Sequence, residues 1–89
     1  MKNFAVAAAM SLGRHTTADI RIDDKSISRL HCFIIPSPDG SQIKIKDLNS
    51  ESGTIVDERK ISEATLSKGM AFFLGKAYRI EIKEGKGRV

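Results

Sequence analysis

Residues 42–46 read Gln-Ile-Lys-Ile-Lys, a strict alternation of polar and apolar side chains. The same period of two recurs in Asp-Ile-Arg-Ile-Asp at residues 19–23 and in Tyr-Arg-Ile-Glu-Ile-Lys at residues 78–83. Because successive side chains of a strand point to opposite faces, each stretch would place its isoleucines on one buried face. The dominant pattern therefore predicts half-buried antiparallel strands.

Further strands are expected on either side of these stretches. Residues 30–35 form an apolar run broken only by His31, which we interpret as a central strand covered on both faces. The Pro-Ser-Pro-Asp-Gly sequence that follows it favours a hairpin loop. Shorter strand patterns lie at residues 4–6, 10–12, 53–56 and 71–74, whereas residues 62–68 have only a weak helical character.

The chain length sets the number of domains. Eighty-nine residues suffice for one hydrophobic core and not for two. Short strands separated by glycine turns are typical of an all-β sandwich or a small barrel. We expect one domain over residues 1–83, followed by a flexible tail or linker stub at residues 84–89.

Composition excludes several classes of protein. The net charge of +4 favours anionic partners without choosing among them, and the scarcity of aromatic residues argues against a stacking platform for single-stranded nucleic acid. The lone Cys32 excludes an internal disulfide and a cysteine-rich metal site, so we expect a small buried side chain. The apolar residues 4–10 are too few to span a bilayer, so no membrane partner is expected.

The sequence also offers no catalytic arrangement. No Gly-x-Ser-x-Gly, His-Glu-x-x-His or nucleotide-binding glycine loop is present. Ser28 and His31 lie three residues apart along a predicted strand, so we expect their side chains to face opposite sides and not to act as a dyad. The adjacent Asp23 and Asp24 are interpreted as turn residues, so no metal, cofactor or small-molecule substrate is expected.

Three polar clusters fall in predicted loops, at residues 13–14, 26–31 and 49–54. Loops at one end of a sandwich can meet although they are distant in sequence, and binding groups concentrate there. Together these loops supply two arginines and several hydroxyls but few acids. Guanidinium groups match phosphate oxygens bidentately, so this inventory suits a phosphate.

The same clusters resemble the forkhead-associated (FHA) domain family, whose pattern is Gly-Arg, Ser-x-x-His, then Asp-x-x-Ser-x-Asn-Gly-Thr-x-Val. The matching residues, in chain order, are Gly13-Arg14, Ser28-Arg29-Leu30-His31 and Asp47-Leu48…Ser50…Gly53-Thr54-Ile55-Val56. Residues 26–29 and 78–81 are most similar to the FHA domains of nibrin-type DNA-repair scaffolds.

The resemblance implies an FHA-like antiparallel β-sandwich of two twisted sheets and a role for each matching residue. Arg14, Ser28 and Arg29 would bind phosphate, with Gly13 allowing the backbone to turn so that Arg14 reaches the pocket. The pocket scaffold would comprise Gly13, His31, Gly53 and Thr54. Contacts to the partner's backbone or flanking residues would come from Glu51, Ser52 and Lys76.

Two departures from the family pattern are visible. Ser52 stands where the family usually has an asparagine that both donates to and accepts from the bound peptide backbone. A serine offers a single donor, so we expect looser gripping by about 1 kcal/mol. The family's first strand also begins further upstream than Met1 allows, which indicates a curtailed N-terminal edge, or one completed by another chain.

The resemblance predicts a phosphothreonine-dependent protein-interaction module that is not an enzyme. Its nibrin-like features imply DNA-damage or cell-cycle signalling in the nucleus, with the cytoplasm as the alternative setting. One alternative function is an FHA-like domain that has lost phosphate binding and acts in dimerisation or constitutive contacts. A second is a small basic nucleic-acid-binding β-barrel, which we favour less and whose binding would fall steeply with salt.

Overall fold

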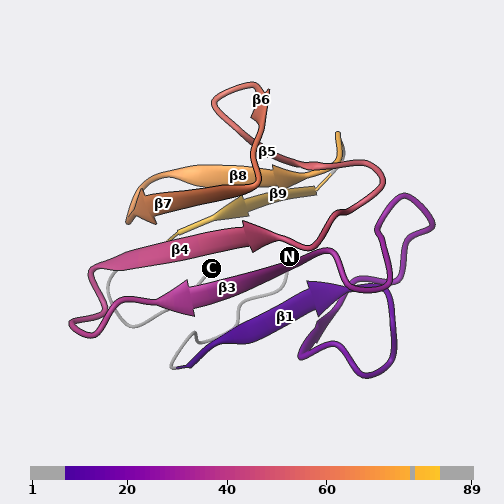
Figure 1. The fold of residues 1–89 in the computed structure, drawn as a ribbon, viewed down its shortest axis with the longest axis horizontal. Coiled ribbons are helices and arrows are strands. Elements are labelled where there is room, and N and C mark those ends of the chain that lie inside the picture. The colour runs from indigo at the N-terminus through magenta and orange to yellow at the C-terminus, as the bar shows by residue number, and fades with distance from the viewer. Residues whose placement is uncertain (1–7, 77, 83–89) are drawn as a thin grey trace.

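The computed structural model describes residues 8–76 and 78–82, and every regular element in these ranges is a strand (Figure 1). One sheet has the strand order β2-β1-β3-β4-β7 and the other the order β6-β5-β8-β9. The nine strands are β1 (Met10–Gly13), β2 (Ile20–Arg21), β3 (Cys32–Pro36), β4 (Gln42–Asp47), β5 (Thr54–Val56), β6 (Arg59–Lys60), β7 (Glu63–Ser67), β8 (Ala71–Leu74) and β9 (Tyr78–Glu81). The predicted all-β, two-sheet architecture is confirmed.

The core lies between the two sheets. The first sheet contributes Leu12, Ile34 and Ile45, and the second contributes Phe72 and Leu74, all of them completely buried. Burying one side chain of this size stabilises the fold by about 1.5–3 kcal/mol, so the inward-facing side chains of the two sheets account for most of the stabilisation of the fold. Cys32 is buried in the same cluster, and this burial raises the pKa of its thiol to about 12. The prediction that Cys32 is buried is confirmed.

The prediction that residues 30–35 are covered on both faces is wrong. β3 pairs in antiparallel register with β4, placing Ile34 opposite Ile45 on the inner face. Phe33 and Ile35 alternate to the outer face and remain 36% exposed. The side chains of β3 therefore alternate between the inner and the outer face as in any half-buried strand. The apolar run is continuous because the outward-facing positions are apolar as well.

Residues 62–68 form no helical turn. Instead β7 is the edge strand beside β4, in a register that places Leu66 opposite Ile43 and Ala64 opposite Ile45. The pattern Glu-Ala-Thr-Leu-Ser alternates, but with only one large apolar residue its period is weak in sequence. Pairing with β4 and burial of Leu66 decide the conformation, which local propensity could not predict.

The stretch 19–23 is shorter as a strand than expected. Only Ile20–Arg21 pairs, and it runs parallel to β1, whereas the other strand pairs among the described residues are antiparallel. The predicted strands at residues 10–12, 42–46, 53–56 and 71–74 are confirmed to within one residue at either end. The expected strand fragment at residues 4–6, the domain boundary after residue 83 and the tail at residues 84–89 lie outside the described residues.

The strand directions decide where the loops gather. β1, β4 and β8 all point toward the right-hand end of the view in Figure 1, and the β2–β3 loop lies there as well. The β3–β4 hairpin at residues 36–41 and the β7–β8 turn lie at the opposite end. The three polar loop clusters therefore meet at one end of the sandwich. Within the described residues, no helix is long and apolar enough to cross a membrane.

Candidate functional site

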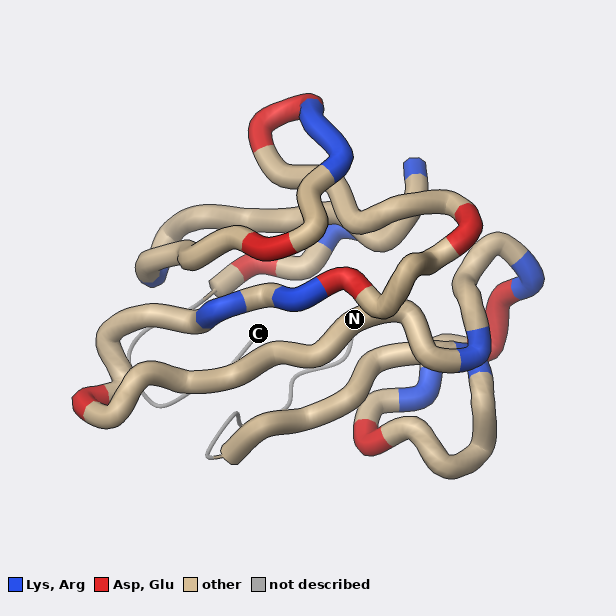
Figure 2. The backbone as a smooth tube through the Cα atoms, in the orientation of Figure 1, with Lys and Arg blue, Asp and Glu red and all other residues tan. Residues whose placement is uncertain are grey.

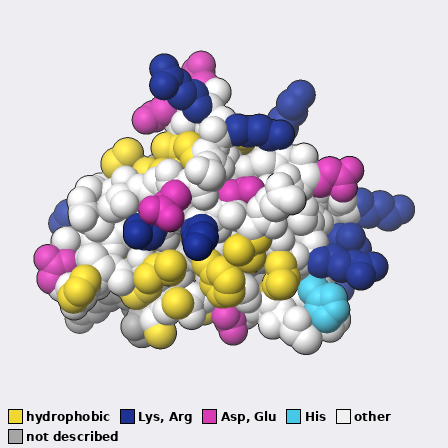
Figure 3. Space-filling view, viewed as in Figure 1, with side chains coloured by type: hydrophobic (Ala, Val, Ile, Leu, Met, Phe, Trp, Pro, Cys, Tyr) yellow, Lys and Arg dark blue, Asp and Glu magenta, His cyan; other side chains and the backbone are white. Residues whose placement is uncertain are grey.

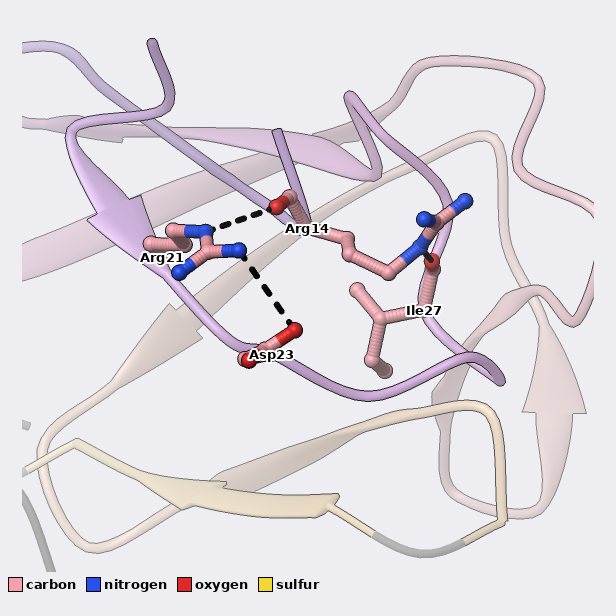
Figure 4. Close-up of polar contacts among 4 residues, drawn as sticks. All are labelled: Arg14, Arg21, Asp23 and Ile27. Carbon is pink, nitrogen blue, oxygen red and sulfur yellow. Dashed lines mark hydrogen bonds and ion pairs between the residues drawn. The ribbon is translucent and has the colours of Figure 1, made fainter. Parts of the chain in front are cut away.

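Arg14 directly follows β1, and hydrogen bonds fix both its backbone and its side chain. Its backbone nitrogen donates to the Ser28 carbonyl at 2.9 Å, and its side-chain Nε donates to the Ile27 carbonyl at 3.1 Å. Arg21 Nε donates to the Arg14 carbonyl at 3.0 Å (Figure 4). The two terminal nitrogens of Arg14 extend past Ile27 and meet no partner among residues 8–76 and 78–82. A guanidinium fixed through Nε presents these two donors in a set direction.

Gly13 is required here for a reason other than the predicted turn. Its φ is not positive, since the positive-φ glycines are positions 40, 53, 69 and 75. A Cβ at Gly13 would instead overlap the carbonyl oxygen of Arg29 and lie 2.7 Å from its carbonyl carbon. The absent side chain lets the strand carrying Arg14 pack directly against the loop that carries Ser28 and Arg29.

Ser28 lies beside Arg14 on the same rim and is half-buried. The backbone nitrogen of Glu51 donates to Ser28 Oγ at 2.9 Å, which links the β2–β3 loop to the β4–β5 loop. This bond uses an acceptor site of the hydroxyl, whose hydrogen has no acceptor among the described residues. Ser28 is therefore fixed in place with its donor still available.

His31 is fully buried beneath these loops. The Ser28 backbone nitrogen donates to His31 Nδ1 at 3.3 Å, and His31 Nε2 lies 2.8 Å from the Gly53 carbonyl oxygen. A backbone N–H can only donate and a carbonyl can only accept, so the ring carries its hydrogen on Nε2. The premise that Ser28 and His31 face opposite sides of a strand is wrong, because residues 28–31 bend. The ring still meets the backbone of Ser28 and not its hydroxyl.

Asp47 braces the β4–β5 loop from inside. The fully buried Thr54 hydroxyl donates to Asp47 Oδ1 at 2.8 Å, and the Ser50 backbone nitrogen donates to Oδ2 at 3.0 Å. Burial by itself would raise the pKa of Asp47, but the hydrogen bonds from Ser50 and Thr54 outweigh it and hold the pKa below its ordinary value. The ionised carboxylate is therefore part of the native structure.

Asp47→Asn tests this brace through pH. A carboxyl whose folded pKa is lowered stabilises the fold above its unfolded pKa and loses that contribution as the pH falls through the folded pKa. We expect the variant to be less stable at pH 7, by about 1 kcal/mol for charge-assisted bonds made neutral. Its stability should also fall less than that of the wild type below about pH 4. Urea unfolding at pH 7 and pH 3 measures both effects, with the exposed Asp57→Asn as control; parallel pH profiles for the wild type and Asp47→Asn would contradict the assignment.

Ser52 and Gly53 connect the β4–β5 loop to two neighbours. Ser52 Oγ donates to the Ser26 carbonyl at 2.7 Å, and the Gly75 backbone nitrogen donates to the Gly53 carbonyl at 2.8 Å. Gly53 has a φ of 90°, a conformation that favours glycine. The exposed Lys76 follows Gly75, so the β8–β9 turn carries a cation to the same rim.

Sequence reasoning missed the bonds that hold the β2–β3 loop. The Ser26 backbone nitrogen and hydroxyl both donate to Asp24 Oδ1, at 2.8 and 2.6 Å, and the Tyr78 hydroxyl donates to Asp24 Oδ2 at 3.1 Å. The bonds from Ser26 and Tyr78 lower the pKa of Asp24, and its carboxylate raises the pKa of Tyr78. The sequence predicted Asp24 as a turn residue, and the Asp-x-Ser spacing is the local signal that could have revealed its bonds to Ser26. No local signal connects it to Tyr78, 54 residues away.

Charged side chains of both signs surround this rim. Figure 2 places several lysine and arginine positions, and some acidic ones, on the loops at this end, and Figure 3 shows basic side chains beside a histidine on the surface. The exposed basic residues are Arg21, Lys25, Arg29 and Lys76, next to the exposed His15, and the exposed acids include Asp23 and Glu51. Among the described residues no cluster of His, Cys, Asp and Glu could hold a metal ion. The arrangement is suited to binding an oxyanion through fixed donors.

The structure thus brings together all ten residues singled out from the sequence, though not in one role. Arg14 and Ser28 expose free donors at the rim, and Arg29 projects its side chain into solvent beside them. Gly13, His31, Gly53 and Thr54 lie buried below. Glu51 contributes its backbone nitrogen, Ser52 bonds within the protein, and Lys76 lies on the adjoining turn.

Sequence comparisons with known proteins point to a single family. The family model described as FHA domain matches residues 10–75. The glycogen accumulation regulator GarA of Mycolicibacterium smegmatis is 33% identical over 66 residues, which cover 74% of this chain and 40% of that protein. The chain therefore spans less than half the length of this curated relative.

Solved structures agree. The FHA domain of the CT664 protein from Chlamydia trachomatis has a TM-score of 0.75 and 38% identity over 84% of this chain and 76% of that chain. Mycobacterium tuberculosis EmbR, in complex with a low-affinity phosphopeptide, has a TM-score of 0.76 and 30% identity over 90% of this chain and 21% of that chain. These relatives are bacterial, and none of them supports the predicted similarity to nibrin-type DNA-repair scaffolds or a nuclear location.

Proposed function

This chain belongs to the FHA domain family, and we propose that it is a non-catalytic module that binds a phosphothreonine-containing segment of another protein. One observation carries the proposal. At a single rim, the terminal nitrogens of Arg14 and the hydroxyl hydrogen of Ser28 have no partner among the described residues, although the atoms next to them are held by hydrogen bonds. EmbR, a similar structure, contains a bound phosphopeptide, which further supports the proposal.

The free donors at this rim supply a large part of the energy that binding a phosphothreonine requires. A phosphothreonine carries about −1.5 to −2 charges at neutral pH. Hydrogen bonds to charged groups are worth roughly 1.5–3 kcal/mol each, and Arg14 and Ser28 offer three donors. Three such bonds total roughly 4.5–9 kcal/mol, whereas micromolar affinity corresponds to about −8 kcal/mol, so contacts with the residues that flank the phosphothreonine must offset the ordering costs.

The other rim residues receive supporting roles in this proposal. Arg29 adds a second cation next to the phosphate, and Lys76 lies where residues flanking the phosphothreonine would pass. The carboxylate of Glu51 disfavours an acidic residue of the bound partner segment at the position next to it. His31, Gly53 and Thr54 hold the loops in place without touching the partner.

We place this module in bacterial regulation rather than in DNA-damage signalling. The curated relative named as a regulator of glycogen accumulation is bacterial, and this chain matches only part of it. The cytoplasmic setting, which was the alternative expected from the sequence, is the one that fits such relatives.

A titration with a degenerate phosphothreonine peptide pool and its unphosphorylated twin tests the proposal. We expect micromolar binding to the phosphorylated pool and none to the twin. Equal binding of both pools would instead favour the FHA-like domain without phosphate binding. Mixed DNA and RNA oligonucleotides form a third arm, and salt-sensitive binding to them alone would favour the basic nucleic-acid-binding barrel.

Phosphothreonine should bind more tightly than phosphoserine in an otherwise identical peptide. The threonine methyl group can pack beside the pocket, and one buried methyl is worth about 0.8 kcal/mol, or roughly a four-fold difference in affinity. Calorimetric titration of the two peptides measures the ratio. Equal dissociation constants would show that the pocket does not contact the methyl group.

A further inference from the structure

The hydroxyl of Ser52 is already used within the protein. Ser52 Oγ donates to the Ser26 carbonyl at 2.7 Å, across 26 residues of sequence. A serine hydroxyl has one hydrogen to donate, so this bond leaves none for the backbone of a bound segment. The structure therefore departs from the expectation that Ser52 grips the partner.

The bond joins the same two loops that position Ser28. Two residues after Ser26, Ser28 Oγ accepts from the backbone nitrogen of Glu51, the residue before Ser52. The two links run side by side between the β2–β3 and β4–β5 loops. Ser26 is in turn fixed by its two hydrogen bonds to Asp24, so the Ser52 bond ties the β4–β5 loop to an ordered turn.

The β8–β9 turn supports this arrangement from the other side. A Cβ at Gly75 would lie 3.0 Å from Ser52 Oγ, closer than most real side chains approach, so the glycine leaves room for the serine. The Gly75 backbone nitrogen also donates to the Gly53 carbonyl at 2.8 Å. Ser52 is thus packed between Gly75 and the carbonyl that it bonds.

We infer that Ser52 is a positioning residue: its bond to Ser26 sets the spacing of the two loops and thereby holds the Ser28 hydroxyl where a phosphate binds, while donating nothing to the partner backbone. That a phosphate binds beside Ser28 rests on the proposed function. The position of Ser28 relative to Ser52 rests on the hydrogen bonds of the free protein. A positioning role for Ser52 implies that affinity depends on the phosphate and on side-chain charge more than on gripping of the peptide backbone.

The test compares two probes with the wild type and Ser52→Ala. The first is N-acetyl-phosphothreonine-N-methylamide, which has almost no flanking chain, and the second is a phosphothreonine peptide from the pool. If Ser52 positions Ser28, the variant weakens both probes by the same factor, about five-fold for one hydrogen bond. If Ser52 instead grips the peptide backbone, only the peptide loses affinity, and the inference is overturned, as it is by unchanged affinity for both.

The matched control is Ser41→Ala. The Ser41 hydroxyl also donates one bond, to Asp39 Oδ1 at 2.7 Å, but lies in the hairpin at the opposite end of the sandwich. It should leave the affinity for both probes unchanged. A loss in this variant equal to that in Ser52→Ala would show that any lost hydroxyl bond weakens binding, which contradicts a specific role for Ser52.

Amide hydrogen exchange of the free protein separates the inference from the proposed function. Ser52→Ala should speed exchange at Glu51, whose amide donates to Ser28 Oγ across the two loops, and at Ser28, whose amide donates to His31 Nδ1, and leave Phe72 in the core unchanged. If the wild type binds neither probe, the phosphothreonine proposal fails while the exchange data still decide the link between the loops. Unchanged exchange at Ser28 and Glu51 would overturn the link itself.

Discussion

Arg14→Ala is expected to abolish phosphate-dependent binding, with a loss of affinity of about 100-fold or more. The variant removes two terminal nitrogens that no described residue uses, and each hydrogen bond to a charged phosphate is worth roughly 1.5–3 kcal/mol. It also removes the bond from Nε to the Ile27 carbonyl, which holds the guanidinium toward the rim. Calorimetric titration with a phosphothreonine peptide measures the loss directly.

Arg79→Ala controls for the change in net charge. Arg79 is an exposed residue of β9 whose guanidinium contacts Glu81 at 3.3 Å, and it is not one of the rim residues. We expect at most a two-fold effect, because exposed charges outside the contact are screened by salt. Comparable losses in the two variants would mean that the phosphate is attracted by overall charge and not bound by Arg14. Arg14→Lys should recover only part of the affinity, because an ammonium cannot bind bidentately.

Gly13→Ala should be more damaging than alanine at Gly53, Gly69 or Gly75, because only at Gly13 would the new Cβ overlap backbone atoms. The new Cβ would overlap the Arg29 carbonyl, and backbone on both sides leaves nothing flexible to yield. Overpacking of this kind costs about 1–3 kcal/mol, which lowers the melting temperature of a domain this size by roughly 4–8 °C per kcal/mol. Because the displaced loop carries Ser28 and Arg29, affinity for the phosphopeptide should fall as well.

Gly69→Ala isolates the steric argument. Gly69 has a φ of 88°, so alanine is strained there, yet its Cβ would meet nothing within 4 Å. Its turn lies at the end of the sandwich away from the rim. We expect about 1 kcal/mol of destabilisation with unchanged phosphopeptide affinity. If Gly13→Ala keeps full affinity and stability, the close approach to Arg29 has no functional consequence.

Alternation was enough to predict the strands that have large isoleucines on one face and charges on the other. β4 and β9 follow the pattern because their polar positions face solvent. It failed at β3, where Phe33 and Ile35 are apolar although exposed, and at β7, where Leu66 alone carries the apolar signal. In both cases the neighbouring strand β4 decides the outcome, and a single sequence does not show that pairing.

The candidate site was predictable in its residue types and only partly in its geometry. The family resemblance placed Arg14, Ser28 and His31 on converging loops, and the backbone bond between Arg14 and Ser28 joins two of these loops. The hydrogen bonds from Ser52 to Ser26 and from Tyr78 to Asp24 span 26 and 54 residues. Such contacts depend on loop conformation, which residue type and spacing do not determine.

Chemical-shift mapping of the wild-type protein locates the surface that binds the phosphate. A ¹⁵N-labelled sample is titrated with the tightest phosphothreonine peptide from the pool and, separately, with its unphosphorylated twin. Binding at the rim predicts that the largest amide shifts fall on Arg14, Ser28, Arg29 and Glu51, and only with the phosphorylated peptide. Shifts centred on the β3–β4 hairpin or on the outer face of β3, or equal shifts with both peptides, would contradict it.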